Sequence, residues 1–527
     1  MIGGSMADYD AIIIGSGHNG LANAMMLSRA GWKVLVVEQS DVPGGASKSR
    51  ELTLPGYVHD VHAANIGFFL GSDTFNEFKD DFFANGFGIS AGDQPYASVF
   101  ADGDAVCGYM DPQKMVDELT RQSPNDAEAW KQLLDEFGRF SGHLLGILKM
   151  PMPSAGVLRQ AYKIYRSLGG TDFWDLVQIL LSSGRSFVDS RFESEKVKAL
   201  FTPWGFHLDQ GPDVAGGAMF PYLEVPLDYM NGLAFSTGGI GKLMDAMIAT
   251  IKAKGGDVRL CAAVTQVKVE NGKAVGVVLA DGSAMSAKKA VVASVTPPKL
   301  FGPLVDEGEL PGSFMRKVKG FRYGAATMMV HLAMDGPVPW AAGDHISKCS
   351  YVHCGFTTDD ISRTYYESLL GYLPTSPMLV VGQQSRLDDS RAPEGKETLW
   401  IQVRAVPSVP KGDAAGELTA TDWEALREPY TERVLNKIES VAPGFKERIL
   451  AKYVMTPPDM EKDNPNLVGG DSVSGSHHLD QHFMFRPFAG WSRYRTPVKN
   501  LYMIGQSTWP GAGLSAASGY LCAKDLL

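Results

Sequence analysis

The chain is 527 residues long, is 44% hydrophobic and carries a formal net charge of −10. That length allows two or three domains with sizeable cores, and the acidic balance argues against a nucleic-acid partner. No apolar run approaches the roughly 20 residues that a membrane-spanning helix needs, although peripheral membrane contact stays open. Met1–Ser5 lack the features of a signal peptide and read as an expression scar. Five scattered cysteines indicate free thiols and a cytoplasmic protein.

The N-terminal segment has the pattern of a strand, a helix and a second strand. Ala11–Ile14 is a short, continuous apolar run, as a buried parallel strand requires. Leu21–Ala30 has helical spacing, and Gly31 is a typical helix end. Val34–Val37 is the second apolar strand. This pattern predicts a complete βαβ unit within about 30 residues.

A glycine-rich turn joins the first strand to the helix. Gly15 makes the tight turn, Gly17 lets the backbone approach a pyrophosphate, and Gly20 lets the helix pack close to the strand. The pyrophosphate is expected at the positive end of the helix. Glu38 ends the second strand, where its carboxylate can accept hydrogen bonds from ribose hydroxyls. The segment therefore predicts a dinucleotide site, and the acidic residue disfavours the 2′-phosphate of NADP.

The rest of the chain alternates between helical and strand-like segments. Helical patterns fill the middle of the chain, at residues 115–120, 127–145, 157–168 and 173–181. Strand patterns return at residues 258–260, 264–269, 274–279 and 290–293, with hairpin signals at Asn271-Gly272 and Asp281-Gly282. A last strand at residues 501–504 precedes a closing helix at residues 515–527.

Nucleotide-binding signals therefore occur at the start, in the middle and at the end of the chain. The simplest architecture is one FAD-binding domain built from residues 6–75, 225–300 and 488–527. Residues 76–224 are expected to form a helical cap, and residues 301–487 a substrate-binding domain. On this architecture, loss of the last 30 residues or so is expected to abolish flavin binding.

Two further groups of glycines favour FAD over NAD. The run Pro43-Gly44-Gly45-Ala46 permits close approach of the backbone to a long cofactor. Gly505, Gly511 and Gly513 form a second glycine-rich turn before a helix, whose N-terminus can stabilise an anionic reduced flavin. FAD is therefore the expected cofactor. No second G-x-G-x-x-G follows a strand, which leaves O2, a quinone or another carrier as the electron acceptor.

Several segments resemble a known superfamily. The residues that resemble the flavin-containing amine oxidase and phytoene desaturase superfamily are Asp10–Ser47, Ser236–Leu243 and Asn500–Gly513. The stretches that are most similar to bacterial relatives of pyridine nucleotide-disulfide oxidoreductase domain-containing protein 2 are residues 18–21, 478–487 and 494–497. Trp509 and Ala512 replace a histidine and a glycine that are common in the family, so Trp509 is expected near the flavin.

The resemblance implies an α/β fold with a Rossmann-like FAD-binding domain of the glutathione-reductase type. This domain is assembled from three chain segments, with an inserted α+β substrate domain and a helical cap. The resemblance also implies an FAD-dependent oxidoreductase. Together with the glycine motif, it gives the expected FAD-binding residues Gly15, Gly17, His18, Asn19, Gly20, Glu38, Gln39, Gly44, Gly45, Ala46, Val264, Gly505, Gln506, Gly513, Leu514 and Ala516.

The expected reaction removes a hydride from a largely apolar small-molecule substrate, as in a dehydrogenase, a desaturase or an oxidase. One alternative is an amine oxidase with an aromatic cage around the amine. A second alternative is a flavoprotein that acts only as a binding or scaffold module. An oligomer is compatible with each of these functions.

Catalytic side chains are marked less clearly than the cofactor site. His59 and His62 lie where the superfamily approaches the flavin ring, and His477 and His478 open the block of similarity near the C-terminus. Each is a candidate base near neutral pH, and each can instead be a structural histidine. Arg486 is expected to be either structural or an anion contact to flavin or substrate. No metal site is expected.

Overall fold

The computed structural model describes residues 8–527, so the excluded segment Met1–Ser5 lies outside it. Five parallel strands form the centre of the first sheet, in the order β20-β12-β1-β2-β9. Their bounds are Leu501–Met503 for β20, Ala284–Ala293 for β12, Asp8–Ile14 for β1, Val34–Val37 for β2 and Asp257–Arg259 for β9. The three chain segments expected in the nucleotide-binding domain thus meet in one sheet.

The register of this sheet places buried apolar side chains in rows. Leu35, Ile12, Val291 and Leu501 are direct partners across four adjacent strands, and all four are buried. Continuous apolar runs suit these strands because both faces of the sheet are covered. The alternation of these parallel strands with helices is the α/β fold class expected from the sequence.

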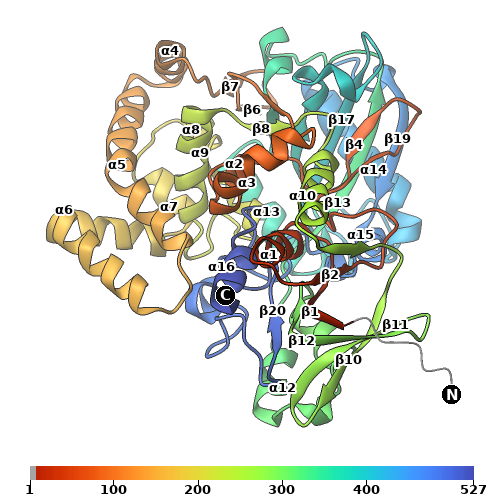
Figure 1. Ribbon diagram of the computed structural model, residues 1–527. Helices are drawn as coiled ribbons and strands as arrows, with labels where there is room; N and C mark the ends of the chain where they lie inside the picture. Colours follow the sequence, from red (N-terminus) through yellow and green to blue (C-terminus); the bar gives the residue numbers. More distant parts are fainter. Residues whose placement is uncertain (1–7) are drawn as a thin grey trace.

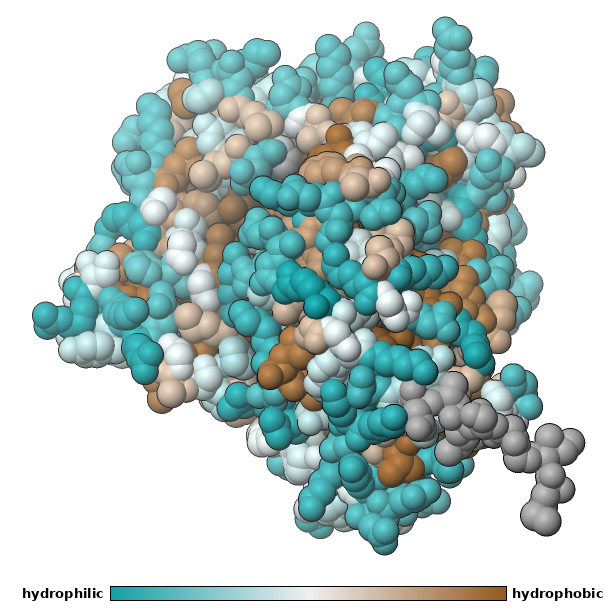
Figure 2. All heavy atoms as spheres, viewed as in Figure 1, coloured by the Kyte–Doolittle hydropathy of each residue, from teal (hydrophilic) through white to brown (hydrophobic). Residues whose placement is uncertain are grey.

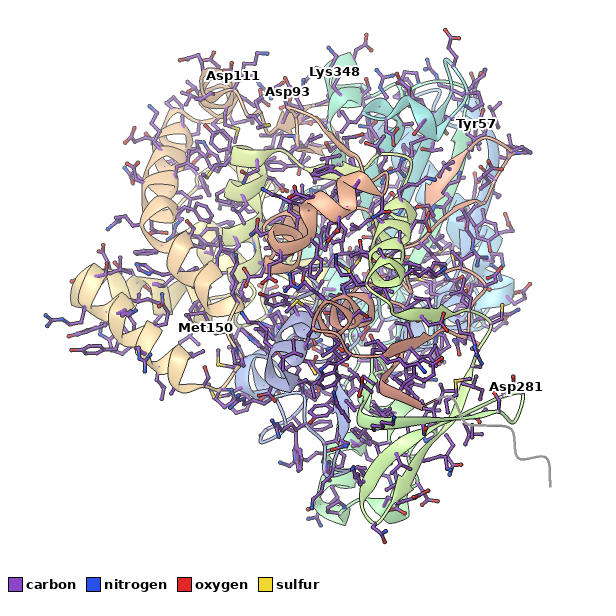
Figure 3. The ribbon with its side chains drawn as sticks, viewed as in Figure 1. Tyr57, Asp93, Asp111, Met150, Asp281 and Lys348 are labelled. Carbon is purple, nitrogen blue, oxygen red and sulfur yellow. The ribbon has the colours of Figure 1, made fainter. Side chains whose placement is uncertain are left out.

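Four helices cover one face of this sheet: α1 (His18–Arg29), α3 (Asp73–Ala84), α10 (Gly241–Ala253) and α16 (Ala517–Leu526). α1 packs directly against both α10 and α16. An antiparallel hairpin of β10 (Val264–Glu270) and β11 (Lys273–Leu279) joins the start of β12. Asn271 and Gly272 both have positive φ at the hairpin turn, as its sequence signal predicts. Asp281 marks the following turn (Figure 3).

The second sheet has the strand order β19-β13-β17-β16-β14-β6-β7. Its strands are β6 (Tyr96–Val99), β7 (Ala105–Cys107), β13 (Ala326–Met334), β14 (Tyr351–Cys354), β16 (Met378–Gly382), β17 (Glu397–Val406) and β19 (Ile449–Met455). All neighbouring pairs are antiparallel except β14 with β6. One face packs on α14 (Trp423–Val441), and side chains of the other face join a core that is built mainly from residues 96–235.

β6 and β7 lie in the segment 76–224 that was assigned to a helical cap. They instead extend the sheet formed by residues 301–487, because β6 pairs with β14 over Tyr96–Ser98. Each of these two strands has fewer than five residues, too few to show a clear period in the sequence.

The remainder of that segment is helical. It contains α4 (Pro112–Gln122), α5 (Pro124–Leu148), α6 (Ala155–Leu181), α7 (Gly184–Asp189), α8 (Glu195–Lys198) and α9 (Met219–Asn231). Gly169 has a φ of 82° and divides α6 into two helical stretches, close to the gap expected between residues 168 and 173. α5 and α6 project on the side opposite the β10–β11 hairpin (Figure 1), with Met150 in the turn between them (Figure 3).

The remaining elements connect these layers. The helices are α2 (Gly67–Leu70), α11 (Pro297–Leu300), α12 (Gly312–Lys319), α13 (Thr358–Leu369) and α15 (Pro457–Asp463). The strands are β3 (Ser49–Glu51), β4 (Val58–Asp60), β5 (Ile89–Ala91), β8 (Ala234–Ser236), β15 (Tyr372–Leu373) and β18 (Gly412–Asp413). Hydrophilic and apolar atoms are mixed over the face shown in Figure 2. Within residues 8–527, no helix has the length and apolarity needed to cross a bilayer.

Candidate functional site

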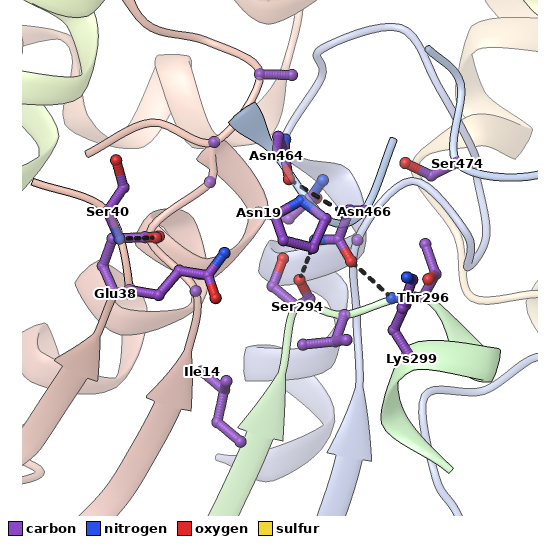
Figure 4. Close-up of a pocket in the computed structure, with 18 of the residues that line it drawn as sticks. Ile14, Asn19, Glu38, Ser40, Ser294, Thr296, Lys299, Asn464, Asn466 and Ser474 are labelled. Carbon is purple, nitrogen blue, oxygen red and sulfur yellow. Dashed lines mark hydrogen bonds between the residues drawn. The ribbon is translucent and has the colours of Figure 1, made fainter. Parts of the chain in front are cut away.

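A cavity lies at the carboxyl ends of β1, β2, β12 and β20, surrounded by all three segments of the first domain (Figure 4). We call it the nucleotide cavity. Its lining includes Gly15, Gly17, His18, Asn19, Glu38, Gln39, Gly44, Gly45, Ala46, Val264, Ser294, Asn466, Gly505 and Gln506. This edge of an open α/β sheet is where nucleotides bind.

Backbone packing explains why the wall of the nucleotide cavity needs glycine. A Cβ atom on Gly20 would lie 2.2 Å from the Gly15 carbonyl oxygen, and one on Gly44 would lie 2.2 Å from the Ser47 carbonyl oxygen. Gly17 and Gly44 are close enough to form an isolated bridge. Side chains at Gly20 and Gly44 would therefore clash with the backbone of their own turns, so these glycines let each turn fold tightly at the cavity wall.

The N-terminus of α1 faces this cavity without a capping side chain. Gly17 is the N-cap residue and makes no side-chain cap, and the first turn contains no acidic residue. The first amide groups of a helix lack partners within the helix, and the helix dipole adds positive potential there. This end of α1 therefore fits a pyrophosphate.

Glu38 is held in place by the turn that follows β1. Its Oε2 accepts hydrogen bonds from the Ser16 amide and hydroxyl, both at 2.8 Å, and its Oε1 accepts one from the Ser40 amide at 2.9 Å. Oε1 keeps acceptor capacity, and the side chain lines the cavity. The carboxylate is therefore positioned to receive the ribose hydroxyls of an adenosine.

The opposite wall comes from residues 463–467, which the sequence had not marked. The side-chain Nδ2 of Asn466 donates to the Ser294 carbonyl, and the backbone amide of Thr296 donates to Asn466 Oδ1, both at 3.0 Å (Figure 4). These bonds tie the loop to the end of β12. They close the cavity over a long ligand, which suits FAD.

A second cavity continues from the first. We call it the central cavity; its lining includes His62, Asn65, Phe68, His207, Glu224, Tyr351, Trp400, Gln402, Arg404, Gly513 and Leu514. It shares Ala46, Leu467 and Gln506 with the nucleotide cavity. The loop before α16 lines it, and α16 has no side-chain cap. The amide end of that helix is therefore near the position expected for the flavin ring.

A third and largely apolar cavity opens from the central one. We call it the apolar chamber; its lining includes Phe68, Leu70, Leu145, Leu148, Leu208, Met219, Phe220, Leu223, Glu224, Leu227, Asp228, His477 and His482. It has a volume of about 1690 Å³, part of it open to solvent, and it shares Phe68, Leu208, Phe220, Glu224, Ala512 and Gly513 with the central cavity. The three cavities therefore adjoin one another along one path.

The expected FAD-binding residues cluster along this path. Of the sixteen residues, all but Gly20, Gly513, Leu514 and Ala516 line the nucleotide cavity. Gly513 and Leu514 line the central cavity. Gly20 packs behind the Gly15 turn, and Ala516 is the N-cap residue of α16.

Of the four candidate catalytic histidines, His62 lines the central cavity. Its Nε2 lies 2.7 Å from Asp463 Oδ2, while its buried Nδ1 has no partner. Burial alone would raise the pKa of Asp463, but hydrogen bonds from His62 and Lys48 hold that pKa at about 2. The ionised carboxylate can only accept, so Nε2 carries the proton and Nδ1 keeps a free lone pair. Burial also lowers the pKa of His62.

The other three histidines have different surroundings. His59 bonds to Thr53 and lies 5.4 Å from the ring of His331, and burial lowers its pKa to about 4. His477 lines the apolar chamber, and its Nε2 accepts from the Ala512 amide at 2.9 Å. His478 is half-buried and bonds to Tyr365. Neither His59 nor His478 lines any of the three cavities.

Arg486 and Trp509 both connect loops. The Arg486 guanidinium donates to the carbonyls of residues 474–476 and of Gln506. Of its two expected roles, the structure shows the structural one. Trp509 is buried against Phe483 and donates its indole N–H to the Met150 carbonyl at 2.7 Å. It therefore anchors the turn before α6 and does not line the three cavities.

β17 carries a row of polar side chains that was not predicted from the sequence. Leu399, Ile401 and Val403 face the hydrophobic core beneath α14, whereas the alternate residues Trp400, Gln402 and Arg404 line the central cavity. Alternation with a period of two is the strand signal that could have found this row. Residues 301–487 were predicted only as a substrate-binding domain, without individual strands.

Two buried acids on α9 were also missed. Glu224 lies where the central cavity meets the apolar chamber, and Asp228 lines the chamber one turn later. Burial raises the pKa of Glu224 to about 8, and burial together with Glu224 raises that of Asp228 well above its usual value. Glu224 is therefore mainly protonated at neutral pH. Among residues 8–527, no group of three or more His, Cys, Asp and Glu side chains is arranged to hold a metal ion.

Comparison with known proteins agrees with this geometry. Residues 20–517 match the family of flavin-containing amine oxidoreductases. The chain is 27% identical to mouse pyridine nucleotide-disulfide oxidoreductase domain-containing protein 2, over 97% of this chain and 92% of that protein. It is also 27% identical, with the same coverage of both chains, to the neurosporene-forming phytoene desaturase of Cereibacter sphaeroides.

Solved structures show the same fold. An oxidoreductase from Methanosarcina mazei superposes with a TM-score of 0.63 and 16% sequence identity, over 98% of this chain and 99% of that one. The resemblance inferred from the glycine motifs is thereby confirmed, as is FAD as the cofactor. The chain belongs to the family of flavin-containing amine oxidoreductases and is an FAD-dependent oxidoreductase.

Proposed function

We propose that the protein removes a hydride from a largely apolar small-molecule substrate. The observation that carries this proposal is the apolar chamber, which leads into the central cavity where the cofactor path ends. FAD supplies the hydride acceptor when bound, and the chain binds the substrate and excludes water. The named activity of the Cereibacter sphaeroides relative, a phytoene desaturase, supports an apolar substrate.

We assign to His62 the role of accepting a proton from the substrate. Asp463 holds the ring through Nε2, so the Nδ1 lone pair remains available at the central cavity. The lowered pKa keeps this histidine neutral, which is the form that a base requires. We propose that O2, a quinone or another carrier reoxidises the reduced flavin.

Anaerobic mixing of the FAD-loaded protein with alkyl substrates tests this function. The panel contains an alkene, octanol, octylamine and octanoate, each with a propyl counterpart. We expect at least one long-chain member to bleach the oxidised flavin absorbance and its propyl counterpart to fail. Leu227→Trp, which fills part of the apolar chamber, should weaken binding of the long chain about tenfold without loss of FAD.

Two further variants complete this test. Leu370→Trp changes an exposed leucine far from the chamber lining and should behave as wild type. His62→Asn should slow flavin reduction by about 10²-fold or more, because a positioned base contributes that much. Bleaching by the propyl members alone would refute the apolar assignment. No bleaching by any member would favour a binding or scaffold role.

A specific observation also favours the amine oxidase alternative. Glu224 and Asp228 offer carboxyl groups without a cationic partner, and an ammonium group bound beside them would favour their ionised form. The expected aromatic cage is less well supported. Tyr351 and Trp400 stack with centroids 5.5 Å apart, whereas a guest between two rings needs about 7 Å. Bleaching by octylamine but not by octanol would select this alternative.

We further propose peripheral contact with a membrane through α6. Leu158, Tyr162 and Tyr165 follow one another at helical spacing and are 74%, 63% and 46% exposed. Arg159, Lys163 and Arg166 flank them on the same exposed stretch. Aromatic and cationic residues beside an exposed apolar stripe are typical of interfacial helices. The end of α5, immediately before α6, lines the apolar chamber, so a lipid-soluble substrate would enter from this side.

Vesicle flotation tests this contact. The wild-type protein should float with vesicles of phosphatidylcholine and phosphatidylglycerol in equal parts, and less with phosphatidylcholine alone. Tyr162→Ser combined with Trp174→Ser should reduce bound protein about tenfold, because exposed apolar contacts are lost. Tyr366→Ser changes a tyrosine on α13 that is 48% exposed and serves as the control. Equal flotation of both variants would rule out α6 as the contact.

A further inference from the structure

Three arginine side chains are buried in the part of the chain that the structure describes. Arg391 forms ion pairs with two aspartates, and Arg486 donates to a set of backbone carbonyls. Both of these guanidinium groups are therefore satisfied by the protein itself. Arg404 differs from them in this respect.

The Arg404 guanidinium is largely unpartnered. Nη1 donates to the Ser472 hydroxyl at 3.0 Å, while the buried Nε has no partner. Of the carboxylates in residues 8–527, none forms an ion pair with it within 4.0 Å. The acid that attracts it, Asp471, accepts hydrogen bonds from the amides of Gly324, Val473 and Gly475 instead. Burial lowers the pKa of Arg404 only to about 10, so it stays cationic.

Arg404 lies where a ligand can reach it. It lines the central cavity, together with Gln402 and His207, and each of these two side chains also has a buried polar atom without a partner. His207 is neutral, because burial and then Arg404 lower its pKa. A buried charge without a counter-charge is costly, so an anion that entered this cavity would be stabilised.

The geometry selects the kind of anion. Ser472 occupies Nη1, which leaves the edge formed by Nε and Nη2, and such an edge matches the two oxygens of a carboxylate. The phosphates of FAD belong at the N-terminus of α1, in the nucleotide cavity, and Arg404 is not part of that lining. An anionic reduced flavin is expected at the N-terminus of α16, so the anion considered for Arg404 is a group on the substrate.

We propose that Arg404 binds the carboxylate of the substrate, and that the substrate is an apolar monocarboxylate whose chain occupies the apolar chamber. This proposal rests on the function proposed above. Phe220 and Leu208 line both cavities, so the apolar chamber adjoins the cavity that Arg404 lines. A molecule with one charged end and an apolar body satisfies both regions.

Titration of the FAD-loaded protein with three probes tests the proposal. Octanoate, methyl octanoate and octanol share one chain, and their binding is measured from the change in flavin absorbance without turnover. We expect octanoate to bind at least about tenfold more tightly than the ester or the alcohol. Equal affinity of the wild-type protein for octanoate and its ester would overturn the proposal, whatever any variant does.

Variants at Arg404 test whether this residue causes the preference for octanoate. Arg404→Gln should remove the preference for octanoate and leave the affinity for octanol within about twofold, while Arg404→Lys should keep part of the preference. Arg316→Gln alters an exposed arginine on α12 and should change nothing. A folded, FAD-loaded Arg404→Gln protein that still prefers octanoate would refute the assignment. A different outcome is also defined: wild type shows no preference for the carboxylate, and ligand-free Arg404→Gln has a changed flavin spectrum. Arg404 would then be a flavin contact.

This titration is independent of catalysis. If no member of the alkyl panel bleaches the flavin but octanoate is preferred through Arg404, the anion site stands and the proposed reaction fails. If a long-chain alcohol bleaches the flavin and octanoate shows no preference, the reaction stands and the anion site fails.

Discussion

Replacing Gly519 by alanine is expected to abolish FAD incorporation. Gly519 lies on α16, and a Cβ atom there would be 1.9 Å from the carbonyl oxygen of Asn19 on α1. Two hydrogen bonds also join the helices at this point: the Gly519 amide donates to Asn19 Oδ1, and Asn23 Nδ2 donates to the Gly519 carbonyl. The clash is with backbone, so no side-chain rotation relieves it.

The two helices must therefore separate by about 1 Å or more, to a distance that carbon and oxygen tolerate. Overpacking costs about 1–3 kcal/mol, and each buried hydrogen bond that is broken adds about 1–3 kcal/mol. We expect Gly519→Ala to lose at least about 3 kcal/mol of stability. Because α1 and α16 direct their N-termini at the cofactor path, the flavin site is lost with their packing.

The ratio of flavin to protein absorbance after purification measures this effect, together with the thermal unfolding midpoint. Gly138→Ala is the matched control, since this glycine is exposed on α5 and a Cβ atom there meets no atom within 4 Å. Alanine at such a position should be neutral or stabilise the helix by about 0.5–1 kcal/mol. A Gly519→Ala protein that retains full FAD would show that α16 is not needed for the site.

The stability of the protein is expected to fall as the pH rises toward 8, because of Glu224 and Asp228. The folded-state pKa of Glu224 is about 8, compared with 4.5 for an exposed glutamate, because burial disfavours the charged form. The native state thus binds this proton more tightly than the unfolded state does. The corresponding stability is fully present below pH 4.5 and is lost progressively up to pH 8.

The magnitude follows from the two pKa values. Their difference of about 3.5 corresponds to about 5 kcal/mol at 1.36 kcal/mol per pKa unit, and relaxation of the site reduces this. We expect a loss of about 2–5 kcal/mol between pH 5 and pH 9. The buried histidines instead reduce the stability as the pH falls, because the native state holds them neutral. Burial lowers the pKa of His18 to about 4 and that of His353 to about 3.

A double variant, Glu224→Gln with Asp228→Asn, separates the effect of the buried acids from that of the buried histidines. This variant keeps the shape of the neutral acids and cannot ionise, so urea unfolding of the FAD-loaded protein should depend less on pH above pH 6. Glu128→Gln removes an exposed glutamate on α5 and should follow the wild-type curve. If the double variant lost stability with pH as steeply as wild type, the acids would be ionised in the native state.

The sequence by itself determined the cofactor and the domain that holds it. The βαβ unit, its glycines and Glu38 are encoded within about 30 residues, where spacing alone dictates which side chain meets which backbone. The C-terminal glycine turn is equally local. For the same reason, the helical patterns of the cap matched α5 and both stretches of α6.

Only the tertiary structure decided where the substrate side lies. β6 and β7 join a distant sheet, and the four candidate histidines occupy different surroundings although they form two close pairs in the sequence. The central cavity brings together residues from Ala46 to Leu514, including Glu224 and Arg404. Such a cavity depends on pairing between strands hundreds of residues apart, and local periodicity carries no information about that pairing.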